Sequence, residues 1–244
     1  ADSSEHNLTV SLPQRMKASY ILQACNNQGC TDSDEVFVTG SLAEATGYFK
    51  ASNTDANAEF GTQVALSEDG RVMAVSAILE DGGATGINGD QSDDVANDSG
   101  AVYVFVQNDG SWSQQAYIKA SNTEEDDQFG SSLTLSPNGR ILAVAANEED
   151  GQATGINGDP TDNSLTDSGA VYVFAQSEGV WSQQSYVKAS NAGALDRLGV
   201  SSLALSEDGS VLAIGARDED SSAIGINGDQ EDNSASRSGA VYLY

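Results

Sequence analysis

Acidic and amide side chains recur in three polar stretches of the chain, at residues 80–100, 149–169 and 219–239. Carboxylate, amide and backbone carbonyl oxygens are the ligands that Ca²⁺ prefers, and about six to eight of them surround each ion. Concentrated carboxylates also repel one another unless a cation or water screens them. We therefore expect each stretch to bind one Ca²⁺, which would order a loop that lacks a core of its own. The candidate ligands are Asp81, Asn88, Asp90, Asp93, Asp94, Asp150, Asn157, Asp159, Asp162, Asn163, Asp220, Asn227, Asp229, Asp232 and Asn233.

A second interpretation of these stretches stays open. Asp and Asn side chains also accept hydrogen bonds from nearby backbone N–H groups and so stabilise solvated turns without any metal. The spacing of the acids matches neither an EF-hand nor the glycine-rich nonapeptide calcium repeat. The sequence thus names calcium as the candidate cofactor without fixing its individual ligands.

Other reactive groups are scarce. His6 is the single histidine, so the repeated part of the chain cannot build a Ser-His-Asp arrangement. A pair of acids could in principle hydrolyse a glycosidic bond. A catalytic pair is normally built once, however, whereas these acids occur in every copy of the stretch. We therefore expect a protein that is not an enzyme.

The loops belong to a repeating unit. Tyr48-Phe49-Lys50-Ala51-Ser52-Asn53 returns 69 residues later at Tyr117 and after another 69 residues at Tyr186. A chain that reuses one unit buries its core by stacking copies. We interpret the three lysines of this signature, Lys50, Lys119 and Lys188, as structural partners of neighbouring acids.

Each unit divides into four expected strands. The first two are joined by a tight turn such as Ser67-Glu68-Asp69-Gly70, whose Asp-Gly suits a hairpin. The second strand is almost continuously apolar, which is typical of a strand buried on both faces. The polar stretch follows, and then a Gly-Ala-Val-Tyr strand and a strand that begins at Trp112 or Trp181 and ends in the Tyr-x-Lys signature. The first three strands are expected at 62–66, 72–76 and 100–105, at 131–135, 141–145 and 169–174, and at 201–205, 211–215 and 239–244. Four short antiparallel strands describe a propeller blade.

The motifs of the unit resemble FG-GAP repeats of the integrin α β-propeller. Phe60-Gly61 and Phe129-Gly130 carry the first motif, and Ile214-Gly215-Ala216 keeps part of the Gly-Ala-Pro motif. The resemblance implies an all-β fold of three FG-GAP-like β-propeller blades, the last incomplete, over residues 43–244, in units of about 48–116, 117–185 and 186–244. The family often carries a calcium loop between its first two strands. This chain has only a short turn there, so the family's calcium residues cannot be carried over.

The first 42 residues do not share the repeat. Leu8–Leu12, Tyr20–Ala24 and Val36–Val38 each have the composition of a strand. The run from Tyr20 through Ala24-Cys25-Asn26 to Gly29-Cys30 resembles the last strands of a bacterial fibronectin type III domain. That resemblance implies that residues 1–42 are the C-terminal strands of a sandwich.

Cys25 and Cys30 are the two cysteines of the chain. If the runs on either side of them form a hairpin, the two thiols face each other and form a disulfide, which indicates an oxidising compartment. A pair of reduced thiols is the alternative. A zinc site is disfavoured because no second Cys or His pair completes four ligands.

The charge of the chain limits its partners. Its 37 acidic and 10 basic side chains give a formal net charge of −27, which repels phosphate backbones and anionic membranes. No stretch approaches the ~20 apolar residues that a spanning helix needs. We therefore expect neither nucleic acid binding nor membrane insertion.

The number of units sets a further expectation. A propeller closes with about 4–8 blades, so three units need either the rest of a larger chain or other copies of this one. In the second case, residues 48–52 complete the blade of another copy. The expected function is that of a secreted or cell-surface adhesion or interaction module, whose ligand is a protein or a glycan at a surface. A carbohydrate-binding or carbohydrate-active module and a structural spacer in a surface fibre are the alternatives.

Overall fold

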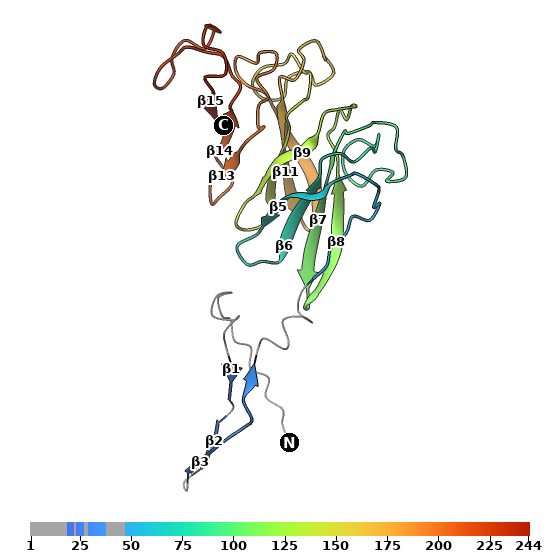
Figure 1. Ribbon diagram of the computed structural model, residues 1–244, viewed down its shortest axis with the longest axis vertical. Coiled ribbons are helices and arrows are strands. Elements are labelled where there is room, and N and C mark those ends of the chain that lie inside the picture. The colour runs from blue at the N-terminus through green and yellow to red at the C-terminus, as the bar shows by residue number, and fades with distance from the viewer. Residues whose placement is uncertain (1–18, 22, 27–28, 38–46) are drawn as a thin grey trace. The chain divides into compact units, whose positions relative to one another are not determined.

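The computed structural model describes residues 19–21, 23–26, 29–37 and 47–244 (Figure 1). These residues form strands and loops and contain no helix, which confirms the predicted all-β fold. None of them forms a helix that is long and apolar enough to cross a membrane. The chain divides into two compact units, Ala1–Phe49 and Lys50–Tyr244.

The described part of the first unit consists of short strands. The strand β1 (Ser19–Tyr20) pairs with β4 (Val36–Phe37), and β2 (Gln23–Asn26) pairs with β3 (Gly29–Asp32), both antiparallel. Cys25 and Cys30 lie opposite each other in the second pair and form the expected disulfide. The predicted strand at Leu8–Leu12 lies outside the described residues, and the fibronectin-like assignment stays a prediction.

The second unit contains three antiparallel sheets in a row, each built from one repeat. The first sheet holds β5 (Phe60–Leu66), β6 (Val72–Ala77), β7 (Ala101–Asn108) and β8 (Ser111–Ile118). The second holds β9 (Phe129–Leu135), β10 (Ile141–Ala146), β11 (Ala170–Ser177) and β12 (Val180–Val187). The third holds β13 (Leu203–Leu205), β14 (Leu212–Ala216) and β15 (Ala240–Leu243). Sequence order equals spatial order in every sheet, so each strand pairs with its neighbour in the chain.

The apolar second strands β6 and β10 are buried on both faces along most of their length, as predicted, whereas β14 alternates between buried and partly buried residues and so is fully buried on one face only. Along β10, Leu142 and Val144 pack into a core with the first sheet, whereas Ala143 and Ala145 pack into a core with the third. Successive side chains of a strand point to opposite faces, so an unbroken apolar run is what a central sheet between two others requires. The two cores join the three sheets into one body.

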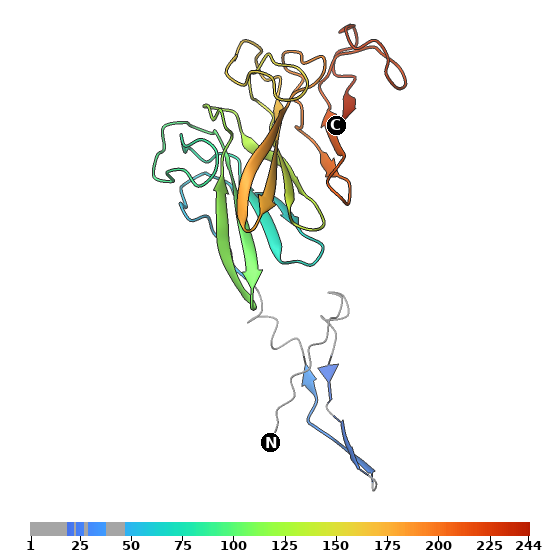
Figure 2. The same ribbon diagram turned by 180° about the vertical axis from the view of Figure 1, so that it is seen from behind.

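The two kinds of connection lie at opposite ends of the sheets. Both views show the long loops between the second and third strands gathered at one end of the second unit and the tight hairpin turns at the other (Figures 1 and 2). Repeated side chains of those loops therefore lie at the same end of the second unit.

Candidate functional site

A buried glutamate begins each long loop. Glu80 follows β6, and its side chain is 2% exposed. Its Oε1 accepts hydrogen bonds from Asn53 Nδ2 at 2.7 Å and from the Tyr117 hydroxyl at 2.8 Å. Its Oε2 accepts hydrogen bonds from Lys119 Nζ at 2.7 Å and from the Gly82 N–H at 3.1 Å. The loop, the fourth strand and the segment before the sheet thus meet at one carboxylate.

Lys119 completes this network from the end of the fourth strand. Its Nζ also donates to Ser99 Oγ at 2.7 Å, and Ser99 Oγ donates to the backbone carbonyls of Glu80 and Gly82. Burial lowers the pKa of the Lys119 ammonium, while the Glu80 carboxylate opposes that shift. The ion pair is closed off from solvent, since the lysine side chain has no exposed area.

The second repeat builds the same network with its own residues. Glu149 accepts hydrogen bonds from Lys188 Nζ at 2.6 Å, from the Tyr186 hydroxyl at 2.7 Å and from Asn122 Nδ2 at 3.1 Å. Lys188 Nζ also donates to Ser168 Oγ at 2.6 Å. The interpretation of Lys119 and Lys188 as structural partners of acids therefore holds. Among the described residues no ion pair is seen for Lys50, so its interpretation as a partner of an acid stays a prediction.

Each network also includes an asparagine from the segment that precedes the sheet. The Tyr172 hydroxyl donates to Asn122 Oδ1 at 2.7 Å, and Asn122 lies three residues after Lys119. The signature Tyr-x-Lys-x-x-Asn therefore serves two sheets: its Tyr and Lys bind the glutamate of one sheet, and its Asn binds the glutamate of the next. This division explains why all of its residues recur together.

The backbone adds a second joint between consecutive sheets. The N–H of Phe129 donates to the carbonyl of Ser99 at 2.9 Å, and the N–H of Leu198 donates to the carbonyl of Ser168 at 3.0 Å. The Phe129 ring then packs edge-on against Tyr172, with 5.4 Å between the ring centroids. The Phe-Gly motif thus marks the place where one sheet is fastened to the one before it.

The third repeat holds only part of this network. Glu219 is also 2% exposed, and its carboxylate accepts hydrogen bonds from Asn191 Nδ2 at 3.0 Å and from the Ser221 N–H at 3.1 Å. No lysine or arginine of the described segments forms an ion pair with it. The third glutamate therefore lacks the ammonium and the phenol that the other two have.

The predicted calcium ligands mostly bind the backbone of their own loops. Asp81 Oδ1 accepts a hydrogen bond from the N–H of Asp98, and Asp150 does the same for Asp167 and Asp220 for Arg237. Each of these bonds ties the start of a loop to its end. Asn88 and Asn157 instead accept hydrogen bonds from the N–H groups of Tyr117 and Tyr186 on the fourth strands.

Some of the remaining candidates stabilise local turns, and the others make no hydrogen bond of that type in the described segments. The residues whose Oδ1 accepts from an N–H two residues later are Asp90, Asp159, Asp162, Asp229 and Asp232. Hydrogen bonds from Ser92 and Thr161 hold the pKa of Asp90 and Asp159 below its usual value. Asn163 Nδ2 donates to the Glu124 carboxylate, and the backbone carbonyl of Asp93 accepts a hydrogen bond from the Gly83 N–H. Within the described segments, no side-chain hydrogen bond is seen for Asp94, Asn227 or Asn233.

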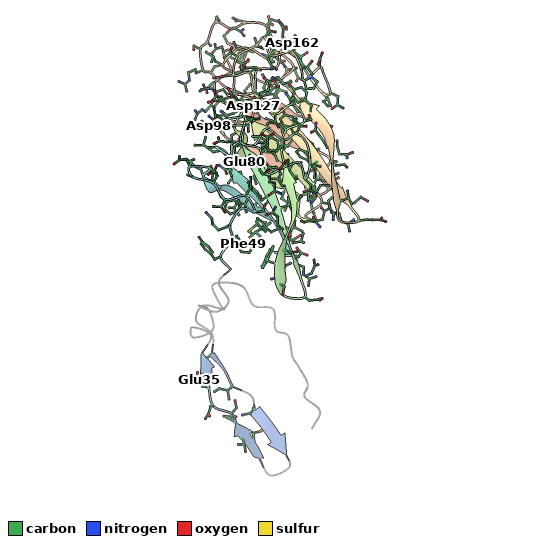
Figure 3. All side chains as sticks on the ribbon, turned by 90° about the vertical axis from the view of Figure 1, so that its right-hand side faces the viewer. Glu35, Phe49, Glu80, Asp98, Asp127 and Asp162 are labelled. Carbon is green, nitrogen blue, oxygen red and sulfur yellow. A yellow bond between two sulfur atoms is a disulfide. The ribbon has the colours of Figure 1, made fainter. Side chains whose placement is uncertain are left out.

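These positions supply donors of the type that calcium takes but do not bring them together. Nowhere in the described segments do three Asp, Glu, His or Cys side chains gather in a way that could hold a metal ion. Figure 3 shows Asp162 at the outer end of the loops, whereas Glu80 lies nearer the strands. Calcium binding by the loops therefore stays a prediction, and no role is derived from it below.

The sequence identified the loops but not the buried glutamates within them. Glu80, Glu149 and Glu219 stand next to Asp81, Asp150 and Asp220, and composition does not separate a buried acid from its exposed neighbour. The signal that could have revealed the buried glutamates was the recurring lysine of the Tyr-x-Lys signature. A lysine that recurs with the repeat in a chain with few basic residues needs a recurring acid, and each glutamate recurs with nearly the same period.

A second buried acid lies near the Glu149 network and gives the fold a pH dependence. Burial raises the pKa of Asp127 to about 8, the Glu124 N–H opposes the shift, and the Glu149 carboxylate adds to it. The unfolded carboxyl titrates near its model value of 3.8, so the folded state binds this proton more tightly. The contribution of Asp127 to stability is therefore present in acid and is lost as the pH rises from about 4 to about 8.

We expect Asp127→Asn to unfold at nearly the same urea concentration as the natural chain near pH 4 and at a higher one at pH 8. The amide keeps an acceptor for the Glu124 N–H but carries no charge, so the gain at pH 8 is on the order of 2 kcal/mol. Asp159→Asn is the matched control, because this exposed carboxylate has a lowered pKa and gains nothing between the two pH values. An equal pH dependence of Asp127→Asn and the natural chain would contradict the assignment.

One comparison with known proteins agrees with this geometry. Residues 112–174 match the family model described as FG-GAP repeat. The match runs from β8 of the first sheet to β11 of the second and so includes the connection that leads from one sheet to the next, with Lys119, Asn122 and Phe129. It confirms the predicted FG-GAP repeat for these residues. No curated protein matches the chain.

Proposed function

We propose that this chain is a non-catalytic, propeller-type interaction module of the integrin α kind, which acts at a cell surface or outside the cell. The observation that carries the proposal is the FG-GAP repeat match together with the repeated display of long loops at one end of three sheets that share two cores. The Cys25–Cys30 disulfide supports an oxidising compartment.

The buried groups of the site favour a structural role over catalysis. Lys119 and Lys188 have no exposed area, and both carboxylates that they bind are also closed to solvent. A substrate therefore cannot reach either lysine or the glutamates that they bind. The networks hold the sheets in place, and the loops offer the contact surface.

The chemistry of the loop end favours a cationic ligand. Asp159, Asp162 and Asp229 are exposed there, and the chain as a whole carries a formal net charge of −27. Such a field attracts a basic protein surface and repels an acidic one, and the attraction weakens as salt is added. We therefore propose a basic protein as the ligand; adhesion through that contact would be the biological outcome.

The test compares two triple variants of the full chain with equal charge changes. One carries Asp159→Asn, Asp162→Asn and Asp229→Asn at the loop end, and the other carries Glu68→Gln, Glu178→Gln and Glu207→Gln at the hairpin turns of the sheets. The loop-end variant should bind a panel of basic proteins about tenfold more weakly or worse, at about 0.5 kcal/mol or more for each contact. The turn variant should bind nearly as well as the natural chain.

Equal losses in both variants would contradict a ligand site at the loops. Hits on a glycan array without binding to basic proteins would favour the carbohydrate-binding alternative over this proposal. The same measurement with a chelator decides the calcium prediction. Unchanged binding would mean that the loops' own hydrogen bonds suffice for the contact, and a loss of binding that Ca²⁺ restores would support calcium as a cofactor.

A further inference from the structure

The Cys25–Cys30 disulfide lies on a polar face of a two-stranded ribbon. Cys25 of β2 is directly opposite Cys30 of β3, and Gln23 is opposite Asp32 in the same ladder (Figure 1). Residues two apart in a strand point to the same side of it, so these four side chains share one face. Gln23 Nε2 donates a hydrogen bond to Asp32 Oδ1 at 2.8 Å, and all four residues are exposed. The amide–carboxylate pair beside the disulfide identifies this face as one that faces water.

Exposure on a polar face makes both sulfurs accessible to an external thiol. Exchange requires that a thiolate reach a disulfide sulfur, so exposed disulfides are the labile ones and closed ones resist reduction. The bond also closes a short loop, since its cysteines are five positions apart, and a short loop gains less stability from its disulfide than a long one. Residues 50–244 contain no cysteine. Opening the disulfide therefore leaves the covalent structure of the second unit unchanged.

The charges around the disulfide select the kind of thiol that reaches it. Asp32 lies two residues from Cys30 on the same face, which is about 7 Å along a strand. Asp34 and Glu35 are exposed just after it, and residues 19–37 contain no lysine or arginine. Negative charge repels an anionic reagent and attracts a cationic one. A thiol whose carrier is positively charged should therefore reach the sulfurs faster than one whose carrier is negatively charged.

We propose that the Cys25–Cys30 disulfide is a site of thiol–disulfide exchange for a positively charged thiol, carried by a basic protein or by a small cationic molecule. The incoming thiolate sulfur forms a bond to one cysteine sulfur, and the bond between the two cysteine sulfurs breaks. Its electron pair leaves with the second cysteine sulfur as a thiolate, which takes a proton from water. The product is a mixed disulfide, and the exchange needs no oxidant or reductant besides the thiol itself. This site does not depend on the ligand proposed above.

The first test measures attachment to the folded full chain without denaturant. The chain is mixed at low salt with cysteamine, a cationic thiol, or with mercaptoethanesulfonate, an anionic thiol, at equal thiolate concentrations. Acid stops the exchange, and the intact mass after alkylation counts the attached thiols. We expect attachment to be about tenfold faster with cysteamine, and we expect added salt to reduce this preference. The double variant Cys25→Ser with Cys30→Ser should take up neither thiol. A folded chain that attaches no thiol, or equal rates with both thiols, would overturn the proposal.

The second test changes the charge beside the disulfide. Asp32→Asn keeps an acceptor for Gln23 Nε2 and removes one charge at about 7 Å from a sulfur, which is worth a factor of about two to three in water. The rate should fall by this factor with cysteamine and rise by it with mercaptoethanesulfonate. Asp159→Asn removes the same charge from the second unit and should change both rates less. Rates that move in the same direction with both thiols would show that charge does not select the thiol.

The third test distinguishes the two sources of the thiol. The probe is a peptide with one cysteine between lysines, at the same thiolate concentration as cysteamine. Faster attachment of the peptide supports a basic protein as the source, and faster attachment of cysteamine supports a small molecule. The fluorescence of Trp112 and Trp181, the two tryptophans of the chain, should stay constant because both lie in the second unit. A change of fluorescence during attachment would mean that the thiols react with an unfolded chain, which contradicts exchange on the folded protein.

Discussion

Lys188→Met is expected to lower the free energy of unfolding of the second unit by about 3–5 kcal/mol, the usual cost of removing one partner of a buried ion pair. The reason lies in Glu149, whose carboxylate is 1% exposed and would remain buried without its ammonium. Methionine fills much of the space of the lysine stem, so the loss reports the charge more than the packing. Urea unfolding followed by fluorescence measures it.

Two further variants separate the ion pair from other effects. Lys50→Met changes the corresponding residue of the first signature, which is exposed, and should alter stability by less than about 0.5 kcal/mol. The double variant Lys188→Met with Glu149→Gln removes both charges and should recover a large part of the loss. Equal effects of Lys188→Met and Lys50→Met would contradict the buried network.

Gly169→Ala is expected to destabilise the joint between the second and third sheets more than any other glycine-to-alanine change in the second repeat. A Cβ atom there would lie 2.3 Å from the backbone nitrogen of Leu198 and 2.7 Å from its carbonyl oxygen, and φ is +78°. The cost combines overpacking of about 1–3 kcal/mol or more with about 1–2 kcal/mol for a left-handed alanine. Backbone atoms cannot move aside as a flexible side chain could.

Gly179→Ala provides the matched control for this prediction. Gly179 has a similar φ of +84°, but a Cβ atom there would meet only the Gln115 side chain at 3.8 Å. This variant therefore has the conformational cost without the collision. The difference between the two melting temperatures measures the close approach of Gly169 to Leu198. Equal shifts would show that the two sheets are not fastened at that point.

The sequence predicted the strands well because the turns and the apolar pattern act locally. Asp69-Gly70 and Asn138-Gly139 fix the hairpins, and the apolar run at β10 follows from burial on both faces. The predicted strand 201–205 is shorter in the structure, at Leu203–Leu205, because Ser201 and Ser202 lie in the connection after Gly199. The recurrence of the signature also placed the fourth strands correctly.

The candidate site was harder to predict because its partners lie far apart in the sequence. Lys119 and Glu80 are separated by 39 residues and meet only after the loop folds back onto the fourth strand. The acids of the loops have the composition of a calcium site, yet Asp81 and Asp90 bind backbone N–H groups. Composition does not distinguish these two uses of a carboxylate, whereas the arrangement of its neighbours does.

The different surroundings of the recurring signature residues could not be decided from the sequence. Tyr48 and Lys50 look identical in type to Tyr117 and Lys119, and only the structure shows that one pair is buried and the other exposed. The same holds for Glu219, which differs from Glu80 in its partners and not in its burial. The repeat supplies the residues of a joint, but only the structure shows which glutamates have a lysine partner.

The central claim of this account is that a buried glutamate, bound by a Tyr-x-Lys strand and by the asparagine that follows the preceding signature, forms the joint between consecutive sheets. The most direct measurement is an experimental structure of the full chain at neutral pH. We expect Nζ of Lys119 at hydrogen-bonding distance from the Glu80 carboxylate, and Nζ of Lys188 in the same arrangement with Glu149. A structure in which Glu80 and Glu149 face solvent and the two lysines touch no carboxylate would contradict the claim.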